Sequence, residues 1–253
     1  MPPHVHESLQ QMVAVLVERF EPERVILFGS HARGAATVDS DVDLLLVMPL
    51  PPGSRFATIV EMRRAVSHSP FPKDIFVCTP EEFAEYRDVV GTLMYPAARE
   101  GIVLYRRQPT RVREEPKGWD QDAVIVRVVR MWVDRAERDW QAVEQLRATQ
   151  PVLAEIVCFH AQQCAEKYLK ALLVARQIPF SKIHELDRLL ELMPPAIDLG
   201  ISSRDVAVLA PCAVDARYPS DSMPESVDLQ AAIDVAGKVR GAARLRLPAG
   251  ALA

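Results

Sequence analysis

The stretch "LFGSHARGAATVDSDVDLLLV", residues 27–47, decides how the first half of the chain folds. It places Gly29 and Ser30 directly after an apolar run, and Asp41 and Asp43 at the start of the next apolar run. A charged side chain is costly to bury in a strand unless it has a partner. Because side chains alternate along a strand, the two aspartates are predicted to share one face of a sheet.

Neighbouring carboxylates repel each other unless a cation compensates, and oxygen ligands of this kind suit Mg²⁺. Gly29 allows the backbone to approach a ligand, and successive N–H groups in such a turn bind anions. Asp74 opens a later apolar run, "DIFV", and would join the pair if that strand lies beside it. This combination is typical of a nucleoside triphosphate site with divalent metal ions. The alternative is an ordinary turn followed by solvated edge aspartates.

The rest of the first half alternates between strand and helix patterns. Apolar spacing and breakers predict helices over 7–19, 54–67, 80–88 and 92–99, and strands over 24–28, 42–48, 73–78 and 101–105. This alternation favours an α/β domain, which we place over residues 1–106.

The second half has a different character. Residues 107–118 are charged, carry proline and lack apolar periodicity, which predicts a linker. Beyond them, helical patterns cover 119–148, 151–176, 184–193, 202–210 and 226–247. No strand pattern stands out, so residues 119–247 are predicted to form an all-α bundle. The fold class is therefore α+β, an α/β domain followed by a helical bundle.

The composition is that of an ordinary globular protein. Apolar residues make up 49% of the 253 residues, and the net charge of −4 provides no general attraction for nucleic acid. No signal peptide or membrane-spanning run is visible. The four cysteines have no metal-binding or framework spacing, so we expect reduced thiols and a cytoplasmic protein.

Residues 20–105 resemble the minimal branch of the DNA polymerase β-like nucleotidyltransferase superfamily, through its pattern G-S-x10-D-x-D. The resemblance implies that Gly29 and Ser30 hold the triphosphate. It implies that Asp41 and Asp43 bind the metal ions. Asp74 matches the third carboxylate, a metal ligand that also orients or deprotonates the acceptor hydroxyl.

Two further residues of the same loop are candidates. Arg33 either contacts the phosphates or is a solvated loop arginine, and the sequence leaves both readings open. His31 is expected to be an exposed loop histidine, although it stands next to Ser30.

The segment "FHAQQCAEKYLKALL", residues 159–173, places polar side chains along one helix face. Such a stripe is either a solvated surface or a binding surface. The side chains that form it are Gln163, Glu166, Lys167 and Lys170.

This segment, with "IHELDRLLEL" and "ARYP", resembles the HEPN family of helical bundles over residues 120–245. The resemblance implies an acceptor site or a second nucleotide site at Lys167, Lys170, His184 and Arg217. A polar network that stabilises the bundle is the rival interpretation. Many family members are ribonucleases with an Arg-x4-6-His motif in a late helix, but this chain has no histidine after residue 200.

We therefore expect transfer of a nucleoside monophosphate from an NTP, with ATP as the expected nucleotide and Mg²⁺ or Mn²⁺ as the cofactor. The acceptor is a protein tyrosine, a small molecule such as an aminoglycoside, or an RNA end. The alternative is a non-catalytic nucleotide-binding regulatory or toxin–antitoxin module, and a HEPN ribonuclease ranks third. No membrane partner is expected, and a homodimer through the helical domain is left open.

Overall fold

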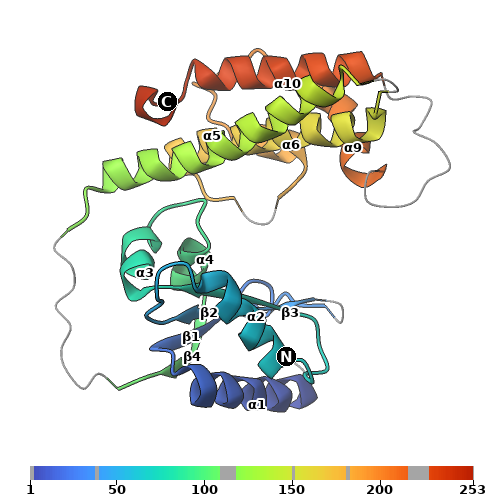
Figure 1. Cartoon of the computed structure of the whole chain (residues 1–253). Helices are drawn as coiled ribbons and strands as arrows, with labels where there is room; N and C mark the ends of the chain where they lie inside the picture. Colours follow the sequence, from blue (N-terminus) through green and yellow to red (C-terminus); the bar gives the residue numbers. More distant parts are fainter. Residues whose placement is uncertain are drawn as a thin grey trace. The chain divides into compact units, whose positions relative to one another are not determined.

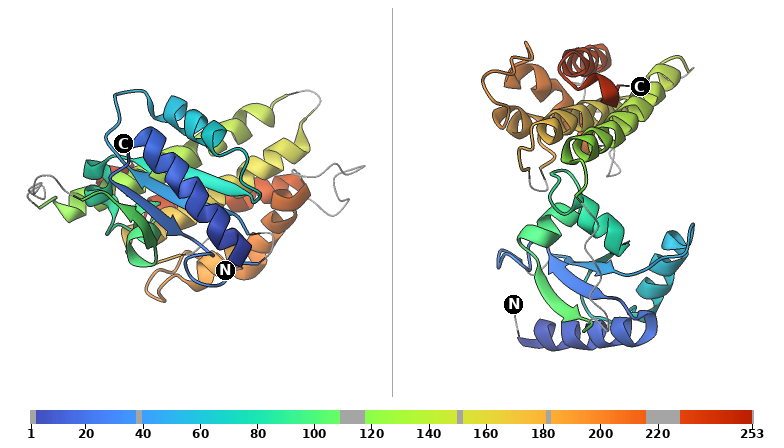
Figure 2. Two further views of the ribbon diagram at one scale, coloured as in Figure 1. Left: turned by 90° about the horizontal axis from the view of Figure 1, so that it is seen from below. Right: turned by 90° about the vertical axis from the view of Figure 1, so that its left-hand side faces the viewer.

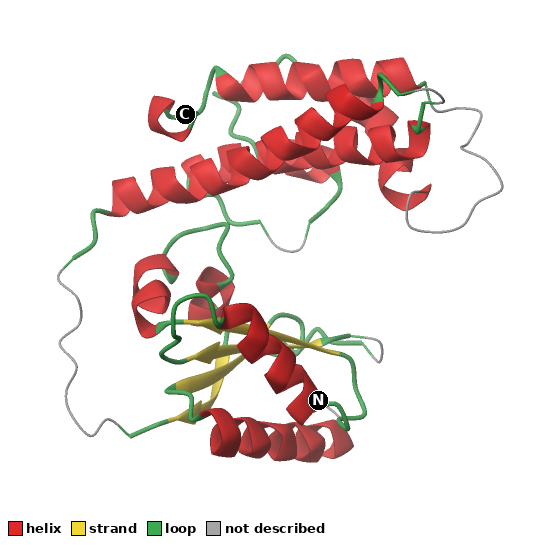
Figure 3. Cartoon of the chain, viewed as in Figure 1, coloured by secondary structure: helices red, strands yellow, loops and turns green. Residues whose placement is uncertain are grey.

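The computed structural model describes residues 3–37, 40–108, 118–149, 152–180, 183–215 and 228–252. The chain divides into two compact units, Met1–Trp119 and Asp120–Ala253 (Figure 1). Every strand of the described residues belongs to the first unit (Figure 3). The predicted class, an α/β domain followed by a helical domain, is thereby confirmed.

The first unit is built on a sheet of four strands in the order β3-β2-β1-β4. β1 pairs antiparallel with β2 and with β4, whereas β2 and β3 run parallel and are joined through α2. The bounds of the strands are β1 Arg24–Phe28, β2 Val42–Val47, β3 Lys73–Cys78 and β4 Ile102–Arg106.

Helices cover both faces of this sheet. Buried residues of α1 (Pro3–Phe20) and α2 (Arg55–Ala65) pack on one face, and Figure 2 (left) shows α1 crossing the strands. The other face packs against α3 (Pro80–Tyr86) and α4 (Met94–Arg99) through Phe83 and Ala97. β2 is therefore buried along its whole length, whereas the edge strand β4 is partly exposed.

Local sequence explains how α3 begins. The Thr79 hydroxyl accepts a hydrogen bond from the Glu82 N–H, and the Glu82 carboxylate accepts one from the Thr79 N–H. Pro80 occupies the first helical turn, where its missing N–H is not needed. This capping box fixes the direction of the chain as it leaves β3.

The second unit is a helical bundle organised around α6 (Ala154–Ala175). α6 packs against α5 (Gln121–Leu146) and α10 (Leu229–Arg244), and its residues Ala161, Ala165 and Leu169 are fully buried. Asp120 caps α5 by accepting a hydrogen bond from the Ala123 N–H. The shorter elements are α7 Leu186–Glu191, α8 Ser203–Val206, η1 Ala207–Leu209, α9 Ala210–Asp215 and η2 Ala249–Ala251.

Most predicted elements recur with shifted ends. The strands predicted over 24–28 and 73–78 have those bounds in the structure. The single helix predicted over 202–210 is instead divided among α8, η1 and α9. The predicted start of the last helix at residue 226 and most of the predicted linker at 107–118 lie outside the described residues.

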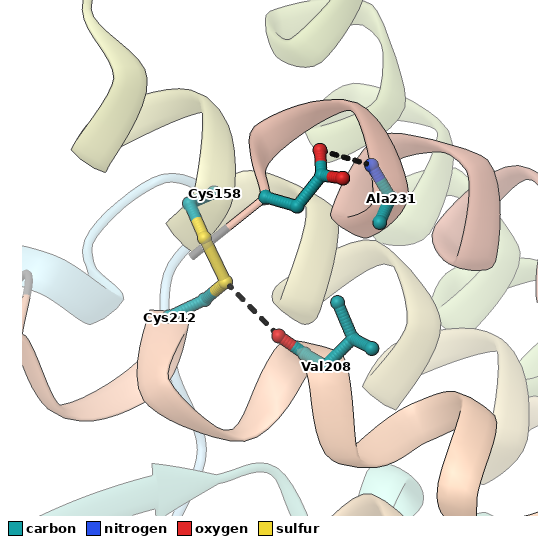
Figure 4. The surroundings of a disulfide bond; sticks show 5 residues. Cys158, Val208, Cys212 and Ala231 are labelled. Carbon is teal, nitrogen blue, oxygen red and sulfur yellow. Dashed lines mark hydrogen bonds between the residues drawn. A yellow bond between two sulfur atoms is a disulfide. The ribbon is translucent and has the colours of Figure 1, made fainter. Parts of the chain in front are cut away.

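The prediction of four reduced cysteines is wrong for one pair. Cys158 on α6 and Cys212 on α9 form a disulfide with a Cα–Cα distance of 5.1 Å (Figure 4). They stand 54 residues apart, so the sequence spacing gives no hint of the pairing that the bundle creates. Cys78 and Cys164 are free and buried, and burial raises the pKa of each thiol to about 12.

None of the described helices is long and apolar enough to cross a bilayer.

Candidate functional site

The parallel pairing of β2 and β3 brings two of the predicted carboxylates together. Asp43 and Asp74 are register partners, and the other register partner of Asp43 is Phe28 at the end of β1. Residues at matching positions of adjacent strands project from the same face, so both carboxylates lie on the face covered by α3 and α4. Asp43 is only 1% exposed, whereas the Asp74 side chain is 46% exposed.

Gly29 is required beside this pair for two independent reasons. Its φ of +75° is a left-handed conformation that other residues adopt only with strain. A Cβ atom at this position would lie 2.1 Å from the Asp43 Oδ2 atom. The end of β1 therefore touches the carboxylate of β2 with no room for a side chain between them.

The chain after Gly29 winds into a short helical turn. The Arg33 N–H donates to the Gly29 carbonyl at 3.2 Å, and the Ala35 N–H donates to the Ser30 carbonyl at 3.0 Å. The Arg33 guanidinium pairs with Glu100 at 3.1 Å, and both side chains are more than one third exposed. Exposed pairs of this kind contribute about 0–1 kcal/mol, so an anionic ligand can replace Glu100 at little cost.

Asp41 is exposed and stands directly before β2, not within it. The backbone is anchored on both sides of it. The Ser40 carbonyl accepts a hydrogen bond from His31 Nε2 at 3.1 Å, and the Val42 N–H donates to the Pro72 carbonyl at 2.9 Å.

The expectation of an exposed His31 is wrong. Its side chain is half-buried, because the loop between β1 and β2 folds back and places Ser40 against the ring. The Nδ1 atom is buried and has no hydrogen-bond partner among the described residues.

Arg63 is a further member of this region that sequence reasoning missed. Its guanidinium lies 3.4 Å from the Asp74 Oδ1 atom, and both side chains are about half exposed. The helical pattern over 54–67 predicts the helix but not which side of it faces β3, because its apolar stripe is weak. The pair is therefore visible only in the fold.

The donor set suits a hard divalent cation, since Asp43 and Asp74 are adjacent and Asp41 is two residues from Asp43. Only Asp43 and Asp74 are strand neighbours, and Asp41 remains at the exposed end. Over the residues that the structure describes, no three His, Cys, Asp or Glu side chains already stand in a metal-binding arrangement.

In the helical unit, the polar stripe of α6 is not a solvated face. The Lys170 ammonium donates to Glu166 at 2.7 Å, and the two side chains are 7% and 6% exposed. The same ammonium lies 5.7 Å from the ring centroids of Trp132 and Phe180. Lys170 is thus held by a carboxylate and two aromatic faces within the bundle.

Glu166 is the centre of this network. Besides Lys170, it receives hydrogen bonds from Gln162 at 3.1 Å and from His184 Nδ1 at 3.0 Å. Burial alone would raise the pKa of Glu166, but the hydrogen bond and charge of Lys170, with those two donors, lower it below its usual range. The carboxylate therefore stays ionised within the bundle.

Lys167 is connected to this network through Gln163, and its acidic partner is Asp139 on α5. Asp139 accepts hydrogen bonds from the Lys167 ammonium and from His160 Nδ1, the latter at 2.8 Å. Lys167 also donates to Gln163 at 3.1 Å. These contacts give the ammonium groups of Lys167 and Lys170 hydrogen-bond partners within the protein, as the interpretation of a stabilising network requires. The fourth candidate, Arg217, lies outside the described residues.

A second polar cluster links α5, α6 and α10. Glu137 accepts hydrogen bonds from Arg240 at 2.9 and 3.0 Å, from Arg244 at 3.1 Å and from the Tyr168 hydroxyl. Burial opposes ionisation of Glu137, but Arg240 and Tyr168 outweigh it and lower its pKa. Arg240 and Arg244 are four residues apart and share a helix face, which was the available sequence signal.

Comparison with known protein families agrees with the division of the chain into two units. The family model for a nucleotidyltransferase domain matches residues 9–98. The family model for the HEPN domain matches residues 129–245. No curated protein matches the chain.

Proposed function

The chain combines a nucleotidyltransferase domain with a HEPN domain, and we propose that it transfers a nucleoside monophosphate from an NTP to an acceptor hydroxyl, releasing pyrophosphate. The observation that carries the proposal is the placement of Asp43 beside Asp74, with Gly29 in contact with the Asp43 carboxylate. A family match alone supports nucleotidyl transfer in general, whereas this placement supports an intact site.

Asp41, Asp43 and Asp74 are the residues that would hold Mg²⁺ or Mn²⁺. When bound, such an ion neutralises charge on the triphosphate and favours the ionised form of the acceptor oxygen. Buried Asp43 supplies a fixed ligand, and the exposed Asp41 and Asp74 are accessible from solvent.

The other steps fall to side chains around these carboxylates. The Ser30 hydroxyl donates to a phosphate, and Arg33 exchanges Glu100 for the ligand. Asp74 accepts the proton of the acceptor hydroxyl as its oxygen attacks the α-phosphorus. The bond from that phosphorus to the pyrophosphate oxygen then breaks, and pyrophosphate leaves.

The helical unit contributes to recognition in this proposal. Among its network residues, His184 is the most accessible, with 61% of its side chain exposed, and Lys167 is partly exposed. Of the predicted candidates Lys167, Lys170 and His184, these two are exposed enough to meet an acceptor or a second nucleotide at the surface. The acceptor itself belongs to one of three classes: a protein tyrosine, a small molecule such as an aminoglycoside, or an RNA end.

The test is transfer of label from α-³²P-ATP in the presence of Mg²⁺ to this protein, to an aminoglycoside and to an RNA oligonucleotide. Asp74→Asn should abolish transfer. Asp88→Asn is the matched control, because Asp88 is 47% exposed and also pairs with an arginine, but lies outside the site. Nucleotide binding without transfer to any acceptor would favour the regulatory module instead.

A further inference from the structure

Asp41 differs from the other two site carboxylates in what fixes its position. Asp43 and Asp74 belong to paired strands, but Asp41 precedes β2 and its side chain is exposed. Packing therefore does little to orient it, and its orientation depends on the backbone immediately around it.

That backbone is held on the side of Ser40 by His31. The Ser40 carbonyl and the Asp41 N–H belong to one planar peptide unit, so a hydrogen bond to the carbonyl fixes the plane that enters Asp41. A carbonyl oxygen can only accept, so His31 Nε2 carries the hydrogen that is donated. The Ser40 hydroxyl adds a bond from the Thr37 N–H at 2.9 Å, which tightens the same turn.

The same histidine is directly joined to the glycine turn. His31 follows Ser30, and the turn that contains it is closed by the hydrogen bonds of Arg33 and Ala35 to the residues before it. Its ring is half-buried, with Nδ1 shielded and unpartnered among the described residues, so the ring has a defined place in the loop. One side chain thus connects the turn at Gly29 and Ser30 to the peptide that carries Asp41.

We propose that His31 is a positioning residue, which aims the Asp41 carboxylate toward the nucleotide by holding the Ser40–Asp41 peptide. This inference rests on the proposed function and deepens it. Groups that hydrogen-bond a metal ligand directly typically contribute 10- to 100-fold in metal affinity or activity, and His31, which acts through the adjoining peptide, is expected at the lower end of this range.

The experiment measures binding of a methylene-bridged ATP analogue by calorimetry over a series of Mg²⁺ concentrations. We expect His31→Ala to weaken the Mg²⁺-dependent part of the affinity by about 10-fold and to leave the Mg²⁺-free affinity unchanged. His31→Gln, which keeps a donor at similar reach, should recover most of the loss. His68→Ala is the matched control, because His68 is an exposed histidine of the same unit.

A second comparison separates positioning from general damage to the fold. In an Asp41→Asn background, His31→Ala should have no further effect on Mg²⁺ dependence, since the group that it positions is already gone. Hydrogen exchange of the Asp41 amide should also be faster in His31→Ala than in His68→Ala.

The outcomes distinguish a failure of the proposed function from a failure of the role of His31 alone. If the wild-type chain does not bind the analogue with Mg²⁺, the proposed function falls and this inference with it. If the wild-type chain binds and His31→Ala shows the same Mg²⁺ dependence, only the role of His31 is overturned. An equal loss in the wild-type and Asp41→Asn backgrounds would likewise overturn it.

Discussion

Asp43 and Asp74 are register partners on the parallel strands β2 and β3, so two acidic side chains stand next to each other on one face of the sheet. Parallel strands carry evenly spaced hydrogen bonds along their whole length, and the register is therefore set by all six pairs from Val42–Lys73 to Val47–Cys78. The proximity of the carboxylates is a property of the sheet, not of a loop. A cation that binds both carboxylates would therefore meet ligands held at a fixed spacing.

The contact between Gly29 and Asp43 gives the first prediction. Gly29→Ala should destabilise the first unit, because the new Cβ would lie 2.1 Å from the Asp43 Oδ2 atom and φ is +75°. Gly34→Ala is the control, since its φ is +71° but nothing lies within 4 Å of the added atom. We expect about 1–2 kcal/mol for the control, from backbone strain alone, and a larger loss for Gly29→Ala. Urea unfolding measures both, and equal losses would contradict the close contact.

Arg63 gives a prediction about the acidic pair. Its guanidinium lies 3.4 Å from Asp74, so Arg63→Ala removes a positive charge that competes with a bound cation. Half-maximal transfer should then occur at a lower Mg²⁺ concentration than in the wild type. Stability should change by less than about 1 kcal/mol, because the pair is exposed. Arg64→Ala, an exposed neighbour on the same helix, should leave the Mg²⁺ dependence unchanged.

The pair of Glu166 and Lys170 predicts a large effect on stability. Glu166→Gln leaves the Lys170 ammonium buried without its carboxylate, which typically costs about 3–5 kcal/mol. Glu144→Gln is the control, since its pair with Arg147 is exposed on the surface of α5. Denaturant unfolding of the full chain measures both changes. A loss below about 1 kcal/mol for Glu166→Gln would contradict the buried pair.

The same carboxylates predict how stability depends on pH. The pKa values of Glu137 and Glu166 are lowered in the folded protein. Burial alone would raise them, but the hydrogen bonds from Arg240 to Glu137 and from Lys170 to Glu166 outweigh it. A lowered pKa contributes stability that is fully present above the ordinary value of 4.5 and is lost as the pH falls through the folded value. The helical unit should therefore unfold in acid, and Glu137→Gln should flatten that dependence. Circular dichroism at several pH values tests this.

Sequence patterns predicted the parts of the site that depend on local structure. The run "RVILF" followed by glycine and the run "KDIFVC" followed by Thr-Pro end where their breakers stand, so β1 and β3 were predictable to the residue. Gly29 and Asp74 follow from these strands, and Asp43 follows from the strand predicted over 42–48. The contacts of His31 with Ser40 and of Arg63 with Asp74 depend on how a loop and a helix pack, which periodicity does not encode.

Long-range pairs in the helical unit were not predictable for the same reason. Glu137 and Arg240 are 103 residues apart and meet only because α5 and α10 both pack on α6. The stripe of α6 was correctly found by its spacing, but spacing does not say whether a polar stripe faces solvent or a neighbouring helix. The partners Trp132 and Asp139, on α5, decide this for Lys170 and Lys167.

The disulfide between Cys158 and Cys212 gives the last prediction. It closes a loop of 54 residues between α6 and α9, and the loss of chain entropy in the unfolded state gives a stabilisation of about 4 kcal/mol. Dithiothreitol should therefore lower the unfolding midpoint of the wild-type chain. It should leave the midpoint of the Cys158→Ser/Cys212→Ser double variant unchanged, because the remaining Cys78 and Cys164 are already thiols. Thiol titration of the denatured protein provides the independent check, since it should find two free thiols before reduction and four after it. Four free thiols in the unreduced protein, purified without reductant under air, would contradict the bond.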